Sequence, residues 1–139
     1  MLSQSTPAVL VTGATGFIGR QLVSRLLVAG RRVVVLARRR EGRPPEARLA
    51  DAFGETFNRL EVVEGDLACP TIIEKSLTQL RSTIHTVIHC AGETSFSAGE
   101  RDSTRIVQID GPLVLLRTLV ARGLRRWSHV STAFVCGRR

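Results

Sequence analysis

The chain has 139 residues, 43% of them hydrophobic, which suits one folded domain and excludes an intrinsically disordered chain. Its net charge of +8 is almost wholly arginine charge, because Lys75 is its single lysine. Cys69, Cys90 and Cys136 form no C-x-x-C pair, so we expect no metal site and no disulfide framework, and a cytoplasmic location.

Such a basic balance is compatible with nucleic acid, an anionic membrane surface or a polyanionic cofactor as the partner. Aromatic residues make up only 4% of the chain and are not interleaved with the arginines, so we expect no nucleic-acid binding. No apolar run reaches the roughly 18–20 residues that a membrane helix needs. The polar start of the chain also does not resemble a signal peptide.

The first predicted element is a strand over Val9–Val11 that runs into a glycine-rich turn, Thr12–Gly19. A helix is expected from about Phe17, because apolar residues then recur at helical spacing. The G-x-x-G-x-x-G pattern in this context is typical of dinucleotide-binding turns, and the alternative is an ordinary glycine-rich turn. Its glycines suit, in order, a tight turn, close approach to a pyrophosphate, and helix–strand packing. The candidate binding residues are Thr12, Gly13, Thr15, Gly16, Phe17, Ile18 and Gly19.

The rest of the chain alternates strands and helices. Strands are predicted at Val33–Leu36, Leu60–Val63, Thr86–His89 and Trp127–Phe134. Helices are predicted at Glu46–Phe57, at Pro70–Leu80, and from a cap at Asp102 or Ser103 to about Gly123. The buried stripe of the last helix should be Ile106, Ile109, Leu113, Leu116 and Val120. The alternation predicts an α/β fold, a Rossmann-type doubly wound parallel sheet with helices on both faces, in a single domain over residues 1–139.

The end of the second strand indicates which dinucleotide binds. Proteins that bind NAD place a carboxylate about 20 residues after the glycine turn, whereas this strand ends in Leu36–Arg39 and no carboxylate occurs before Glu41. An arginine there can pair with a 2′-phosphate. We therefore predict NADP(H) in preference to NAD(H), with Arg38 as the phosphate ligand; the alternative is a plain basic loop. Arg39 or Arg20 could help Arg38 to bind the phosphate, whereas we expect Arg40 and Arg43 to face solvent.

Three more motifs follow predicted strands. They are Gly65-Asp66-Leu67, His89-Cys90-Ala91-Gly92 and the segment His129–Gly137. Taken alone, Asp66 suits a helix N-cap equally well, and we expect His89 and His129 to be packed neutral side chains rather than catalytic bases.

Together with Thr12–Gly19, these motifs resemble the extended short-chain dehydrogenases/reductases. The similarity is greatest to the NAD(P)-binding domain of the thioester reductases and fatty acyl-CoA reductases, and it runs from about Val9 to Arg139. The resemblance implies hydride transfer from a nicotinamide cofactor to an acyl thioester or related carbonyl. It also implies cofactor contacts by Arg38, Asp66, Leu67, Cys90, Ala91 and Gly92, and an active-site hydroxyl at Thr132.

The chain departs from this family at several positions. Gln108 stands where the family has Asn, which puts its active-site water network in question. The sequence also contains no tyrosine, so the proton-donating Tyr-x-x-x-Lys pair is absent. We therefore expect the cofactor half of a longer reductase, truncated after the fifth strand and inactive alone. The alternatives are a non-catalytic dinucleotide-binding or regulatory module and a fragment of a nucleotide-sugar epimerase or dehydratase.

Overall fold

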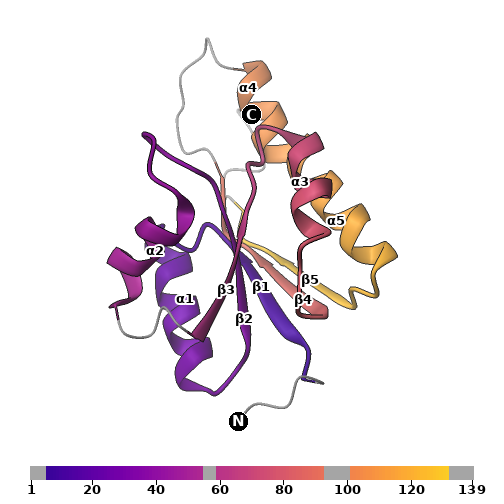
Figure 1. Ribbon diagram of the computed structural model, residues 1–139. Helices are drawn as coiled ribbons and strands as arrows, with labels where there is room; N and C mark the ends of the chain where they lie inside the picture. The colour runs from indigo at the N-terminus through magenta and orange to yellow at the C-terminus, as the bar shows by residue number, and fades with distance from the viewer. Residues whose placement is uncertain (1–5, 55–58, 93–100, 132–139) are drawn as a thin grey trace, which may run out of the picture.

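The computed structural model describes residues 6–54, 59–92 and 101–131, which form a parallel five-stranded sheet between two layers of helices (Figure 1). The strand order is β3-β2-β1-β4-β5. The strands are β1 (Ala8–Thr12), β2 (Val33–Ala37), β3 (Leu60–Glu64), β4 (Ile84–His89) and β5 (Arg126–His129). The helices are α1 (Phe17–Val28), α2 (Pro45–Phe53), α3 (Pro70–Leu77), α4 (Arg101–Arg105), the π-helical η2 (Ile106–Asp110) and α5 (Gly111–Ala121). The predicted doubly wound α/β fold is confirmed.

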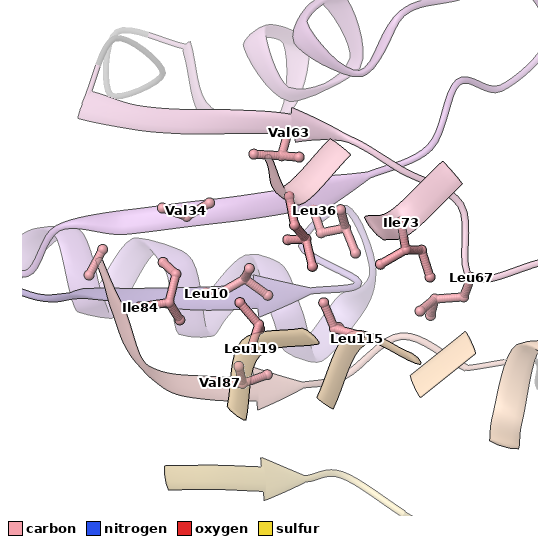
Figure 2. Packing of buried hydrophobic residues seen from close by; sticks show 12 residues of the cluster. Leu10, Val34, Leu36, Val63, Leu67, Ile73, Ile84, Val87, Leu115 and Leu119 are labelled. Atoms are coloured by element: carbon pink, nitrogen blue, oxygen red, sulfur yellow. The ribbon is translucent and has the colours of Figure 1, made fainter. Parts of the chain in front are cut away.

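The two faces of the sheet bury separate apolar clusters. One lies between the sheet and α1 and α2, and includes Val11, Val35, Val23 and Leu49. The other lies under α3 and α5, where Figure 2 shows Leu115 and Leu119 beside Leu10 and Val87. Because β1 and β2 are covered on both faces, their sequences read as continuous apolar runs. No helix among the described residues is long and apolar enough to cross a membrane.

The predicted buried stripe of the last helix is wrong. Ile109, Leu113 and Val120 are 49%, 40% and 56% exposed, whereas Leu115 and Leu119 are fully buried. The helix is apolar on most sides, so spacing alone could not select the inner face. Gly111 selects it, because a Cβ there would lie 2.2 Å from the Leu67 carbonyl oxygen, and only a glycine allows this close approach.

Several predicted boundaries also differ. Asp102 and Ser103 lie inside α4, which already begins at Arg101, so neither caps it. The helix expected to reach Phe57 ends at Phe53, before Gly54 with its positive φ of 54°, and α3 ends at Leu77 rather than Leu80. Strand β5 ends at His129, although the Val130 amide still donates to the His89 carbonyl of β4 at 2.9 Å. The predicted strand beyond residue 131 lies outside the described residues.

Candidate functional site

A cleft of about 250 Å³ opens at the carboxyl ends of the strands. It lies where the chain leaves β1 between its two neighbours, β2 and β4, which is the switch point at which doubly wound sheets bind ligands. Its walls come from the glycine turn, the ends of β2, β3 and β4, and the helices α2 and η2. The lining residues are Thr12, Gly13, Ala14, Thr15, Gly16, Leu36, Ala37, Arg38, Arg40, Arg48, Gly65, Asp66, Leu67, Cys90, Ala91, Gly92 and Val107.

The three glycines of the turn meet different constraints. Gly13 has a positive φ of 70°, and a Cβ there would lie 2.6 Å from the amide nitrogen of Ala91. A Cβ on Gly19 would lie 2.1 Å from the carbonyl oxygen of Gly13. Gly16 is exposed in the cleft, and the nearest atom to its Cβ would be 3.3 Å away. Gly13 and Gly19 are therefore required by the fold itself, whereas the one close contact of a Cβ on Gly16 would be with the Gly13 carbonyl oxygen, at 3.3 Å.

A buried polar group joins β1 to β4 beneath the cleft. The Thr12 hydroxyl and His89 Nδ1 share a hydrogen bond of 2.8 Å, and the Ala91 amide donates to Thr12 Oγ1 at 3.2 Å. Burial, and then the nearby His129, lower the pKa of His89 to about 4, so this side chain is neutral as expected. His129, in contrast, is exposed, although its ring centroid lies 4.8 Å from that of His89.

One wall of the cleft is basic and differs from the sequence prediction. Arg38 lines it as expected, but so does Arg40, which was expected to face solvent. Arg39 does not line it and instead forms an exposed ion pair with Glu64, at 3.2 and 3.3 Å. These arginines lie beyond Ala37, the last residue of β2, and Arg40 pairs with Arg43 across a turn, so the path of this loop decides which of them faces the cleft. Arg20 is also absent from the lining.

Sequence reasoning missed Arg48, the third arginine of this wall. It lies in α2, and its guanidinium donates to the Arg38 carbonyl at 2.7 Å and to Thr15 Oγ1 at 3.2 Å. The available signal was its position in the first turn of the helix that follows the basic loop, because that turn faces back toward the carboxyl end of the sheet.

The motif after β3 forms a turn at the cleft floor. Asp66 Oδ1 accepts from the Ala68 amide at 2.9 Å, and Cys69, not Asp66, is the N-cap residue of α3. Asp66 therefore stabilises a turn and does not cap the helix. Its other carboxylate oxygen has no hydrogen bond to the protein among the described residues. Leu67 is buried beneath it.

The motif after β4 crosses the opposite side of the cleft. Burial raises the pKa of the Cys90 thiol, which makes it a weak nucleophile. A Cβ on Gly92 would lie 3.0 Å from Gln108 Oε1, so the side chain that replaces the family's Asn contacts this turn. Ala91, which lies between Cys90 and Gly92 in the sequence, also lines the cleft.

Other predicted site residues lie elsewhere. Phe17 and Ile18 begin α1 but are 89% and 49% exposed and do not line the cleft. Thr132 and Cys136 lie outside the described residues. Within the described part of the chain, no cluster of His, Cys, Asp or Glu could hold a metal ion.

Comparison with known proteins identifies the family. Residues 9–139 match the model of the NAD dependent epimerase/dehydratase family. The chain is 30% identical to human fatty acyl-CoA reductase 1, and the match covers 94% of this chain and 29% of that protein. It is 34% identical to UDP-glucose 4-epimerase of Erwinia amylovora, and that match covers 94% of this chain and 38% of the epimerase. A short-chain dehydrogenase/reductase superfamily structure from Agrobacterium tumefaciens with bound NAD superposes with a TM-score of 0.69 at 26% identity, covering 94% of this chain and 34% of that one.

These matches agree with the motifs at the strand ends. The chain spans only about a third of the length of these relatives. The match to the family model, in contrast, includes nearly all residues of this chain. The chain therefore belongs to the NAD dependent epimerase/dehydratase family, within the short-chain dehydrogenases/reductases.

Proposed function

We propose that the chain binds NADP(H) in the cleft and is the cofactor-binding part of a reductase for an acyl thioester or related carbonyl. The observation that carries this proposal is the basic wall: Arg38, Arg40 and Arg48 line the cleft where a protein selective for NAD needs a carboxylate. An arginine there can pair with a 2′-phosphate through two parallel hydrogen bonds. The similarity to fatty acyl-CoA reductase 1 supports the substrate class.

The residues present fit a nicotinamide dinucleotide. Gly16 offers exposed main chain at the start of α1, where free amides and the helix dipole favour a pyrophosphate. Asp66 retains acceptor capacity in the cleft, where the resemblance to the short-chain reductases implies that it contacts the adenine, and Leu67 lines the cleft beside it. Cys90, Ala91 and Gly92 would line the nicotinamide side. The bound cofactor would supply the hydride, and this chain's residues would bind and orient it.

The protonation step needs a group that these 139 residues lack. They contain no tyrosine, and Lys75 is exposed on α3 and does not line the cleft. The Thr132 hydroxyl is proposed to hold the substrate oxygen, but a threonine is too weak an acid to donate the proton alone. We therefore expect this chain to bind the cofactor without reductase turnover. We also expect its location to be the reducing cytoplasm.

The first test asks whether the glycine turn binds the pyrophosphate. Gly16→Val places a branched side chain on the open surface of the turn, so NADP+ affinity measured by calorimetry should be lost while the circular dichroism spectrum stays unchanged. Unchanged affinity in this variant would remove the turn from the proposed site.

The second test compares the two cofactors. The unmutated chain should bind NADP+ more tightly than NAD+, and Arg38→Ala should narrow that difference. Equal affinity for both cofactors, or a preference for NAD+, would contradict the proposal. It would favour the second candidate, a nucleotide-sugar epimerase or dehydratase, which the 34% identity to UDP-glucose 4-epimerase supports.

A further inference from the structure

Arg48 connects two segments of the cleft that are far apart in the sequence. It lies in α2, and one end of its guanidinium donates to the Arg38 carbonyl at the end of β2, at 2.7 Å. The other end donates to the Thr15 hydroxyl in the glycine turn, at 3.2 Å. A guanidinium can make both bonds at once because its donors are fixed in a planar fork, whereas a lysine ammonium is a single point charge.

The electrostatic surroundings of Arg48 are unusual. None of the ion pairs among the described residues involves it. Its pKa is lowered, first by burial and then by the positive charges of Arg40, Arg38 and Arg43, while Glu41 acts weakly in the opposite sense. Three guanidinium groups thus gather on one wall of the cleft. An anion bound there would offset their repulsion.

We propose that Arg48 is a positioning residue that sets the spacing between the pyrophosphate-binding turn and the 2′-phosphate subsite. The inference rests on the proposed function, because those two subsites are defined by NADP(H). Thr15 belongs to the segment that holds the pyrophosphate, and Arg38 belongs to the segment that holds the 2′-phosphate. Both dinucleotides carry the pyrophosphate, but only NADP(H) carries a 2′-phosphate, which must reach Arg38 at a fixed separation from the turn.

The effect of removing the bridge follows from this difference. Without Arg48, NAD+ loses only the support given to Thr15. NADP+ loses that support, the correct placement of the Arg38 segment, and one of the positive charges on the wall. Arg48 should therefore contribute to cofactor selectivity and not merely to the stability of the fold.

The experiment measures NADP+ and NAD+ affinity by calorimetry for the unmutated chain and for Arg48→Met, which keeps an unbranched apolar side chain in place of the aliphatic part of the arginine and removes the guanidinium. We expect Arg48→Met to weaken NADP+ binding about tenfold or more and NAD+ binding about threefold. The matched control is Arg39→Met, because Arg39 lies one residue beyond Arg38 yet pairs with Glu64 outside the cleft. It should change either affinity by less than about twofold.

Arg48→Lys separates the bridge from the charge. A lysine keeps the positive charge but cannot hold both acceptors, so NADP+ affinity should recover only in part from that of Arg48→Met. Full recovery would show that charge alone matters and would overturn the positioning role. This variant also keeps the inference testable if Arg48→Met lowers the melting temperature too far for calorimetry.

The outcomes separate the inference from the proposed function. If the unmutated chain binds NADP+ selectively and Arg48→Met keeps the same ratio of NADP+ to NAD+ affinity, the inference fails and the proposed function stands. If the unmutated chain binds neither dinucleotide, both fail.

Discussion

The two central strands and the β5 edge of the sheet are built very differently. Every residue of β1 is buried, as are four of the five in β2, whereas in β5 only Trp127 is half-buried and its three neighbours are exposed. Strand β1 pairs on both sides, and β5 pairs only with β4 among the described residues. The cleft thus lies at the ends of the most completely buried strands of the sheet.

The largest expected loss of stability follows from the glycine turn on the buried side. Gly19→Ala would place a Cβ 2.1 Å from the Gly13 carbonyl oxygen, and backbone on both sides cannot yield without displacing α1. We expect a loss of more than about 3 kcal/mol in the free energy of unfolding, measured by urea denaturation. Gly16→Ala, whose nearest contact would be 3.3 Å, serves as the control and should cost less than about 1 kcal/mol. Similar losses for both would refute the distinction between the two glycines.

Shortening one apolar side chain to alanine in β1 and one near β5 should show the difference in packing between the two regions. Leu10 is fully buried in the centre of β1, so Leu10→Ala leaves a cavity and should cost about 2–5 kcal/mol. Val130, just beyond β5, is 41% exposed, and Val130→Ala should cost less than about 0.5 kcal/mol. Urea denaturation measures both. Equal costs would mean that the edge is covered in solution.

The sequence predicted the two central strands and the glycine turn better than it predicted the β5 edge. The runs Val9–Val11 and Val33–Leu36 identify strands because burial on both faces demands continuous apolar residues. The spacing of the three glycines identifies the turn, and two of them, Gly13 and Gly19, meet separate steric requirements of the fold. Arg38 and the Gly65–Leu67 motif reach the cleft because parallel strands bring their carboxyl ends to one edge.

The features that the sequence did not predict depend on contacts between elements. The inner face of α5 is chosen by the contact of Gly111 with the Leu67 backbone, which no periodicity can show. Arg48 reaches the cleft because the position of α2 lets its guanidinium meet the Arg38 carbonyl and the Thr15 hydroxyl. The exchange of roles between Arg39 and Arg40 depends on which way the chain turns after β2, and the three-arginine run gives no indication of that.

The junction between the two regions should respond to pH. His89 bonds to Thr12 across β4 and β1, and its pKa is lowered to about 4 in the folded chain against 6.5 for an unperturbed histidine. Between these values the unfolded chain binds a proton that the folded chain does not, so stability falls as pH decreases from about 6.5 to 4. The slope from this group reaches up to about 1.4 kcal/mol per pH unit. Urea denaturation at several pH values measures it. His89→Gln should flatten the curve in this window, and an unchanged slope would assign the effect to other groups.

The smallest effect is expected outside the cleft, at the ion pair between Arg39 and Glu64. Both side chains are about half exposed, at 53% and 45%, so water screens their attraction and little is gained by holding them together. Glu64→Gln removes the charge with almost no change in shape, and should lower the free energy of unfolding by less than about 1 kcal/mol at low salt, with a smaller loss in 0.5 M NaCl, where the screening length is about 4 Å. Because this pair points away from the basic wall, the ratio of NADP+ to NAD+ affinity should stay constant in the same variant. A change in that ratio would mean that Glu64 holds Arg39 out of the cleft, and that the end of β2 is less firmly fixed than its buried residues indicate.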